Sequence, residues 1–250
     1  MHPTQQIYDE LQSAYDHFNK ELFDDALPDC LITLQRERRT FGYYCRDRFV
    51  NHGGTITDEI AMNPAYFGIR SIRKSLSTLV HEMVHQWQIH FGKPGRRGYH
   101  NKEWADKMDA LGLIASNTGQ PGGKRVGEQM DHYIQKGGAF DQACDSLLSK
   151  QYQLSWLDRF PPYLPSKTDS GAPSEAEQDY LDDGQPDVGH DDEEDEEQVS
   201  PYVQLPTETV NKTNRHKYRC PVCESQAWGK PGLQLICGGE GCDKARFNVV

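Results

Sequence analysis

The 250-residue sequence lacks any run of eighteen apolar residues, the length that a helix needs to cross a bilayer. Its first residues, MHPTQQIYDELQ, lack the basic patch and apolar stretch of a secretory signal. Cysteine is scarce in residues 1–211, which contain only Cys30, Cys45 and Cys144. Because these three are isolated in the sequence, we expect them to be buried, reduced thiols. We therefore expect no membrane partner and a cytoplasmic location, or the nucleoid if the source is a bacterium, phage or plasmid.

Basic residues are nearly absent from one stretch of the chain. Residues 161–211 contain fifteen Asp or Glu and one Lys, whereas residues 1–160 contain twenty acidic and nineteen basic side chains. The net charge of −11 would by itself argue against a nucleic-acid binder. Because the excess negative charge lies in one segment, it does not exclude DNA as a partner of the rest.

The acidic stretch also contains seven prolines and the run DDEEDEE at 191–197. Such a segment repels itself and has little apolar surface to offset the entropy cost of ordering. The sequence therefore predicts three parts: a globular domain of residues 1–160, a disordered acidic linker of residues 161–211, and a small basic module of residues 212–250. The linker is interpreted as a solvated spacer, or else as a strip that mimics nucleic acid or screens a basic site.

Four of the cysteines lie in the last 31 residues: Cys220, Cys223, Cys237 and Cys242. They form a C-x2-C pair and a C-x4-C pair, with thirteen residues between the two pairs. Two cysteine pairs with a short excursion between them are typical of a zinc ribbon, in which tetrahedral thiolate coordination stabilises a segment too small for its own core. Two disulfides are the alternative, but they need an oxidising compartment. His216 is a further candidate ligand, although four cysteines already complete the shell. We expect one structural zinc here.

Periodicity predicts the elements of the first domain. Apolar residues recur at helical spacing over residues 5–23 and 71–91, and a further helix is expected at 101–111. Three strands are expected at residues 30–35, 41–49 and 55–62, with a turn at 51–54. Residues 117–127 are expected to form a mobile loop and 128–149 two weak helical pieces broken at Gly137. The predicted fold class is α+β, with a small sheet packed on helices.

The helix expected at 71–91 carries His81-Glu82-Met83-Val84-His85. Residues four apart lie on one face of a helix, so both imidazoles can bind one metal ion, and Glu82 can reach a water molecule on it. Two neutral imidazoles and a neighbouring carboxylate are the groups that zinc-assisted peptide hydrolysis needs. The sequence therefore predicts a zincin-like catalytic zinc with Glu82 as general base. The alternative is two surface histidines on a packing helix.

A third ligand is needed to complete a catalytic zinc site. His90 lies nine residues after His81 and projects from the opposite side of the helix. Phe91 stands where a metzincin has its third histidine. His100 follows a glycine- and arginine-rich loop at the head of the next helix, and Glu103 lies eighteen residues after His85. Geometry alone favours His100 and leaves Glu103 as the alternative.

The segments HEMVHQWQ and GYHNKEW resemble the SprT-like metallopeptidase domain, which includes the Spartan DNA–protein crosslink proteases. Members pair the H-E-x-x-H helix with a third histidine in G-H-x-x-E-F, which matches His100 here with Trp104 as the aromatic residue. Many members also end in a zinc ribbon. The chain departs in its acidic linker and in the C-x4-C spacing, and no clamp- or ubiquitin-binding motif is evident in the linker.

The resemblance implies a zinc-dependent endopeptidase that acts on DNA-bound or DNA-crosslinked proteins, as in DNA repair. A non-catalytic DNA- or transcription-associated zinc protein is the alternative, and a zinc peptidase without a DNA role is a third reading. His132 and Tyr133 are candidate donors to the oxyanion, although core or surface packing is the more common role of such residues.

We expect a monomer with a protein substrate and with DNA as a partner. Basic groups attract phosphates and exposed aromatic rings stack on unpaired bases. In the first domain the candidates are Arg36, Arg38, Arg39, Arg96, Arg97, Lys124 and Arg125. In the ribbon they are Lys212, Arg215, Lys217, Arg219, Lys230, Lys244 and Arg246, with Tyr218, Trp228 and Phe247 interleaved.

Overall fold

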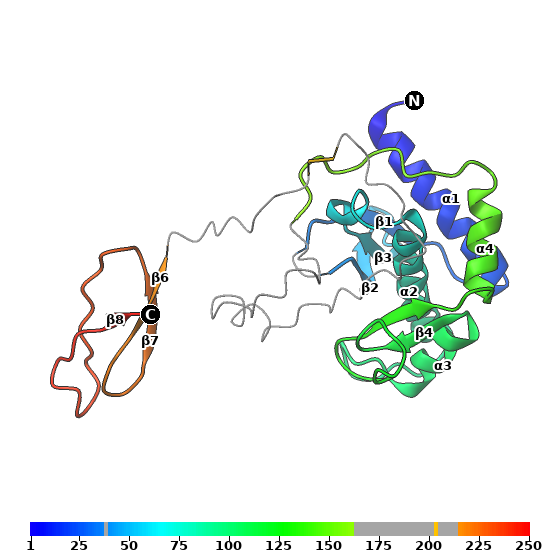
Figure 1. Cartoon of the computed structure of the whole chain (residues 1–250). Coiled ribbons are helices and arrows are strands. Elements are labelled where there is room, and N and C mark those ends of the chain that lie inside the picture. Colours follow the sequence, from blue (N-terminus) through cyan, green and yellow to red (C-terminus); the bar gives the residue numbers. More distant parts are fainter. Residues whose placement is uncertain (38–39, 163–202, 205–214) are drawn as a thin grey trace. The chain divides into compact units, whose positions relative to one another are not determined.

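The computed structural model describes residues 1–37, 40–162, 203–204 and 215–250 (Figure 1). The chain divides into two units, residues 1–206 and 207–250, and each is described by itself. Nearly all of the predicted linker, and its predicted boundary with the ribbon at residue 211, lie outside the described residues. Among the helices that are described, none has the length and apolar character that a bilayer span requires.

The first unit begins with helix α1 (Pro3–Phe23), as the periodicity predicted. Its apolar face is buried against the rest of the unit, and Asp24, in the left-handed conformation with φ of 55°, ends the helix. Helix α4 (Ala139–Leu148) packs beside α1, where Phe18 stacks on Phe140 with the ring centroids 5.5 Å apart (Figure 1). These two helices form one wall of the core.

The three predicted strands are confirmed as β1 (Leu31–Leu34), β2 (Gly42–Val50) and β3 (Ile56–Met62). They form one sheet in the order β1-β3-β2, with β1 parallel and β2 antiparallel to β3. The predicted turn joins β2 to β3, where the N–H of Gly54 donates to the carbonyl of Asn51. Strand β2 therefore lies at an edge of the sheet and has one side free of strand partners among the described residues.

The register of β2 shifts between Cys45 and Phe49. Asp47 lies in this bulge with φ of 51°, and its N–H donates to Oδ1 of Asp58 at 2.9 Å. The other carboxylate oxygen of Asp58 accepts from the hydroxyl of Tyr44 and lies 2.7 Å from Nε2 of His90. One buried carboxylate thus ties the bulged edge strand to the end of the next long helix.

That helix is α2 (Ile72–Phe91), which follows a short 3-10 turn at Pro64–Tyr66. Ser71 caps it by accepting the N–H of Lys74. Helix α2 contacts β2, β3 and the three other helices, and is thus the central helix that the H-E-x-x-H pattern predicted (Figure 1). Its buried apolar residues belong to the main core: Leu76, Leu79, Val80, Met83 and Val84.

Helix α3 (Lys102–Ala110) is also as predicted, with Asn101 as its cap. It leads into β4 (Leu113–Ser116), which pairs antiparallel with β5 (Asp131–Ile134). The prediction of helix for the first piece of 128–149 is wrong. Residues 131–134 are a strand because pairing with the buried strand β4 outweighs their weak local preference.

The second unit holds a three-stranded sheet in the order β7-β6-β8. Its strands are β6 (His216–Arg219), β7 (Gln226–Gly229) and β8 (Asn248–Val249). Apart from Tyr218, the fully buried apolar groups here are cysteines, with Ala245 and Phe247 packed against them. So small a core is expected to need a bound metal ion for stability.

Candidate metal centre and its cleft

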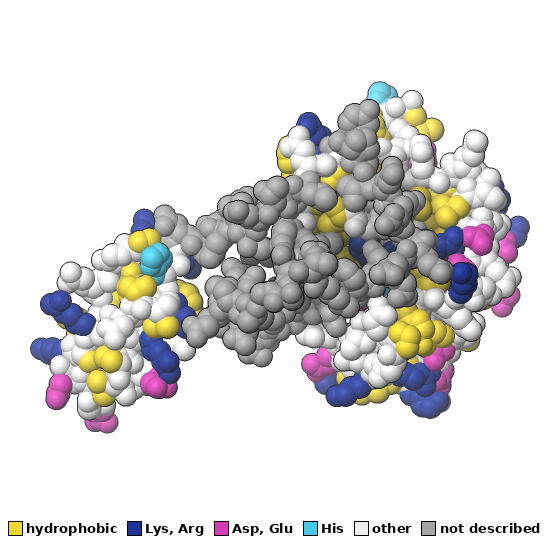
Figure 2. All heavy atoms as spheres, in the orientation of Figure 1, with side chains coloured by type: hydrophobic (Ala, Val, Ile, Leu, Met, Phe, Trp, Pro, Cys, Tyr) yellow, Lys and Arg dark blue, Asp and Glu magenta, His cyan; other side chains and the backbone are white. Residues whose placement is uncertain are grey.

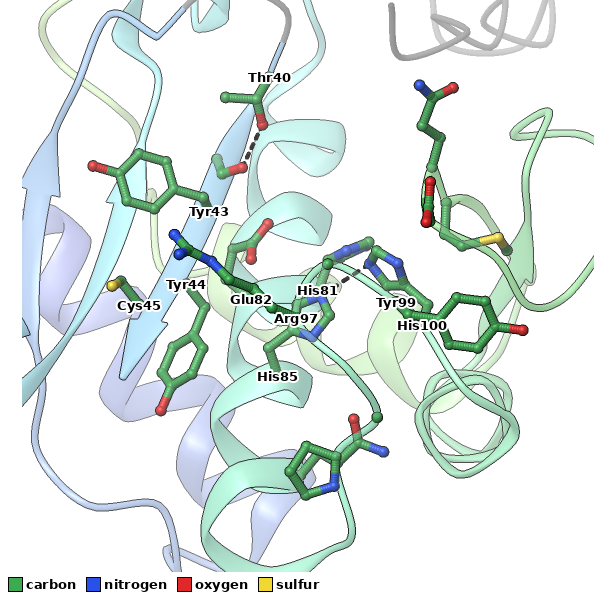
Figure 3. A pocket seen from close by; sticks show the side chains of 18 of the residues that line it. Thr40, Tyr43, Tyr44, Cys45, His81, Glu82, His85, Arg97, Tyr99 and His100 are labelled. Carbon is green, nitrogen blue, oxygen red and sulfur yellow. Dashed lines mark hydrogen bonds between the residues drawn. The ribbon is translucent and has the colours of Figure 1, made fainter. Parts of the chain in front are cut away.

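Helix α2 presents His81 and His85 on one face, four residues apart, with Glu82 beside them (Figure 3). The ring centroids of the two histidines are 5.1 Å apart. The apolar residues on the other faces of α2 are buried in the core, which fixes the rotation of the helix about its axis. The two imidazoles therefore point toward a common position in the cleft.

His100 joins them from the loop before α3. It forms an isolated antiparallel bridge with Gly127, whose N–H donates to the His100 carbonyl at 3.1 Å and whose carbonyl accepts the His100 N–H at 2.8 Å. The Nε2 atoms of His85 and His100 lie 3.1 Å apart. One ligand nitrogen from each of the three histidines lies within 4.8 Å of the others.

These distances fit a zinc ion. Two imidazole nitrogens at zinc–nitrogen distances of about 2.0–2.1 Å in tetrahedral geometry are roughly 3.3 Å apart. Burial lowers the pKa of His85 to about 3, and the pKa values of His81 and His100 also lie below 6.5, chiefly because of burial. All three imidazoles are therefore neutral near pH 7, as metal ligands must be.

Trp104, on α3, forms the apolar floor of this cluster. Its side chain is fully buried, and its ring centroid lies 4.9 Å from that of His81, 5.4 Å from that of His85 and 4.4 Å from that of His100. One indole thus contacts all three predicted ligands. The indole excludes water from the side of the imidazoles that it covers, and it restricts the rotation of the three rings.

Glu82 lies on the sheet side of the cluster and is 6 % exposed. Burial raises the pKa of its carboxyl group to about 8, although the N–H of Tyr44 donates to it and acts in the opposite direction. A Cβ at Gly42 would lie 2.8 Å from the carbonyl oxygen of Ala61 and 3.5 Å from Cγ of Glu82. The contact with Glu82 would be an ordinary one, so the absence of a side chain at Gly42 chiefly lets β2 lie close to β3 beside Glu82.

The cluster opens into a cleft of about 870 Å³. Residues 42–46 of β2 line one side, residues 94–99 of the glycine-rich loop another, and residues 128–132 a third. Arg97 of the loop is one of the residues that line this cleft (Figure 3). The predicted metal ligands thus lie at the bottom of a groove bordered by an edge strand.

The alternative ligand Glu103 does not join the histidines. Its Oε2 accepts the N–H of Lys93 at 2.6 Å and the side-chain amide of Gln88 at 2.9 Å. It thereby fixes the start of the glycine-rich loop. His90 also points elsewhere, as its helical position predicted, since it pairs with Asp58.

Three of the five described basic residues that were singled out in the first domain form ion pairs. Arg96 pairs with Glu128, Arg36 with Asp158 at 2.9 Å, and Arg125 with Asp106 and Asp109. Arg38 and Arg39 lie outside the described residues. The loops of this unit therefore present less uncompensated positive charge than the sequence suggested.

The four cysteines of the second unit also converge. The Sγ atoms of Cys223 and Cys237 are 3.5 Å apart, and those of Cys220 and Cys242 are 4.0 Å apart. All four sulfur atoms lie within 4.8 Å of one another. Tetrahedral thiolates on zinc are separated by about 3.8 Å for zinc–sulfur distances of 2.3 Å. With the C-x4-C spacing the four sulfur atoms therefore surround a position large enough for a zinc ion. His216 is not part of this group.

Sequence reasoning missed three residues that contact functional side chains of the site: Gly42 and Tyr44 lie beside Glu82, and Gly127 pairs with His100. They lie far along the chain from the residues they contact, so no spacing rule marks them. Only the glycines gave a signal, because glycine is common where two backbone segments approach closely.

Parts of the chain are similar to known proteins. The model of the SprT-like family matches residues 11–121. The protein described as "Uncharacterized protein in mucB 3'region" from Salmonella typhimurium is 59 % identical over 59 residues, which make up 23 % of this chain and 80 % of that protein. No solved structure matches the chain.

Proposed function

The chain belongs to the SprT-like family, and on that basis we propose that it is a zinc-dependent endopeptidase that cleaves DNA-bound or DNA-crosslinked proteins. The family supports a metallopeptidase-like or DNA-associated function in general. The observation that carries the specific proposal is the convergence of His81, His85 and His100 beside the buried Glu82 in an open cleft. A site that served structure alone would need neither an adjacent carboxylate nor a cleft.

His81, His85 and His100 would hold the catalytic zinc, and the four cysteines the structural one. Zinc on three neutral imidazoles supplies Lewis acidity, which polarises a carbonyl group and lowers the pKa of a water molecule toward neutrality. Reduced cysteines would be maintained in the cytoplasm, the compartment that we propose for this chain.

Glu82 is the proposed general base. Burial raises the pKa of Glu82, which strengthens the ionised carboxylate as a proton acceptor, and the positive charge of a bound zinc would act in the opposite direction and favour the ionised form. It would take a proton from the attacking water and return it to the leaving amine. The N–H of Tyr44 donates to this carboxylate and helps to fix its position.

The edge strand β2 is the proposed docking site for the substrate. The N–H of Tyr44 points away from β3 but already donates to Glu82, so a peptide would pair with the other outward-facing backbone groups of β2. An extended peptide can pair with a free strand edge through backbone hydrogen bonds. Such pairing would lay the scissile bond beside Glu82 with little dependence on side-chain sequence.

DNA is the proposed partner of the ribbon. Lys217 and Trp228 are paired across β6 and β7, and the ammonium group lies 5.8 Å from the ring centroid. Trp228 is 55 % exposed, and Arg219, which pairs with Glu224 at 2.7 Å, extends from the same face of the sheet as Lys217. Basic and apolar side chains are interspersed over the visible face of this unit (Figure 2). An exposed ring among cations suits single-stranded DNA, which offers bases and phosphates together.

The test compares the zinc-loaded full chain with its Glu82→Gln variant, using a DNA-binding protein as substrate in the presence and absence of single-stranded DNA. We expect wild type to cleave when DNA is present and the variant to be at least about 100-fold slower with equal metal content. Equal cleavage by both proteins would contradict the role of Glu82. Cleavage by neither would favour the non-catalytic DNA- or transcription-associated alternative, and DNA-independent cleavage with no DNA binding would favour a peptidase without a DNA role.

A further inference from the structure

His132 is buried behind the metal centre and is not explained by the hydrolytic mechanism. It lies on β5, paired with Ala115 of β4, and its side chain is 5 % exposed. Its Nδ1 is 3.3 Å from Nδ1 of His81, and its Nε2 is 2.9 Å from Oγ of Ser77. His132 therefore connects one predicted ligand to the helical turn that precedes it.

The direction of these hydrogen bonds follows from Ser77. Its hydroxyl donates to the carbonyl of Lys74 at 2.9 Å, so its oxygen accepts from the Nε2–H of His132. A neutral imidazole carries one N–H, which leaves the Nδ1 of His132 as an acceptor. The carboxylate of Asp131 is 3.7 Å from this nitrogen, beyond hydrogen-bond range. The Nδ1 of His132 therefore accepts from the Nδ1–H of His81.

We propose that His132 is a positioning residue that fixes the tautomer and ring orientation of His81, so that His81 offers Nε2 to the metal. Nε2 is also the nitrogen through which His85 and His100 face each other. The Nδ1 of His100 is 3.2 Å from the carbonyl of Gly127, which acts on His100 in the same way. Residues 127–132 thus orient two of the three ligands.

This arrangement assigns His132 a role other than oxyanion donor. Its only N–H is directed at Ser77, so it has none to offer a tetrahedral intermediate. The inference rests on the metal centre of the proposed function, but it does not depend on peptidase activity. Partners that hold the second nitrogen of a metal-binding histidine typically change metal affinity 10–100-fold when they are removed.

The first test uses the zinc-loaded full chain, labelled with 15N at histidine, and long-range proton–nitrogen correlation spectra. We expect His81 to carry its proton on Nδ1 and His132 on Nε2. A proton on Nδ1 of His132, or on Nε2 of His81, overturns the proposal. This measurement needs only assignment variants and does not depend on the folding of any single one.

The second test measures zinc affinity by chelator competition in two variants. His132→Leu removes the acceptor, and we expect about 10–100-fold weaker binding at the histidine site. His132→Asn places a side-chain oxygen near the position of Nδ1, and we expect it to recover most of that loss. Tyr133→Phe, at the neighbouring position of β5, is the matched control and should bind like wild type.

The zinc of the ribbon serves as an internal reference in each protein and should not change. Thermal unfolding of the metal-free variants measures any loss of stability. A variant that loses zinc affinity but unfolds at the wild-type temperature has lost the contact to His81 and not its fold. Wild-type affinity in His132→Leu overturns the inference even if the chain is an active peptidase. Weakened zinc binding in a chain that cleaves nothing supports the inference while the proposed function fails.

Discussion

The Nε2 atoms of His85 and His100 lie 3.1 Å apart, although the two residues come from different elements fifteen positions apart. The Gly127 bridge holds His100 at this place, while Glu103, three residues further on, turns toward the backbone of Lys93. The two candidate third ligands thus have separate roles. His100 lies with His81 and His85 in the candidate metal centre, and Glu103 anchors the loop that leads to it.

The zinc content of variants should distinguish the roles of His100 and Glu103. We expect His100→Ala to bind one zinc per chain instead of two, because the ribbon site remains intact. Glu103→Gln should retain both zincs, since its side chain contacts only Gln88 and the N–H of Lys93. Elemental analysis of the purified full chains checks this, with Cys223→Ser as the reciprocal loss. Two zincs in His100→Ala would refute the assignment of that ligand.

Gly42→Ala should destabilise the first unit by about 1–3 kcal/mol. The new Cβ would lie 2.8 Å from the carbonyl oxygen of Ala61, so β2 must shift relative to β3. Because β2 also positions Glu82, we expect cleavage to slow as well. Chemical denaturation measures the first effect. Gly53→Ala is the control, because its Cβ would meet only the side chain of Asn51, at 3.2 Å. An equal loss of unfolding free energy in Gly53→Ala would show that steric conflict with β3 is not the cause.

Stability at acid pH should depend on Asp58. Burial acts to raise the pKa of this carboxyl group, but hydrogen bonds from His90, from the Asp47 N–H and from Tyr44 outweigh it, and the pKa lies below 3.8. A carboxylate with a lowered folded-state pKa stabilises the fold fully above its unfolded pKa, and this stabilisation is lost as the pH falls through the folded value.

We therefore expect Asp58→Asn to cost about 1–3 kcal/mol at neutral pH and progressively less below pH 3.8. Denaturant unfolding at a series of pH values gives the difference between the two proteins. A difference that stays constant from neutral pH to pH 2 would show that the charge of Asp58 is not responsible.

The ribbon should bind single-stranded DNA through Trp228. We expect Trp228→Ala to weaken binding by about 1–3 kcal/mol, the range for loss of one stacked base. Lys217→Ala should mainly reduce the salt dependence, because it removes one phosphate contact. Fluorescence anisotropy on the full chain measures both effects. Val222→Ala, an exposed apolar residue on the first cysteine turn, is the control, and an equal effect there would argue against stacking on Trp228.

The elements that are strongly periodic could be predicted from the sequence. Helices α1, α2 and α3 and the strands of the first sheet lie within a few residues of the predicted ranges, because each carries its own pattern of buried residues. Strand β5 was misread as helix. Its four residues, Asp131–Ile134, have no alternating pattern and become a strand only through pairing with β4.

The sequence alone determined the chemistry of both candidate sites. The four-residue spacing on a helix brings His81 and His85 to one face, and two cysteine pairs in a short segment form a thiolate site, because local geometry suffices in both cases. Only the tertiary structure decided which residues lie with the two histidines and with Glu82 in the candidate site. The choice of His100 over Glu103, the Tyr44 contact to Glu82 and the Ser77–His132–His81 chain all depend on backbone segments that meet after folding, and no local pattern encodes those contacts.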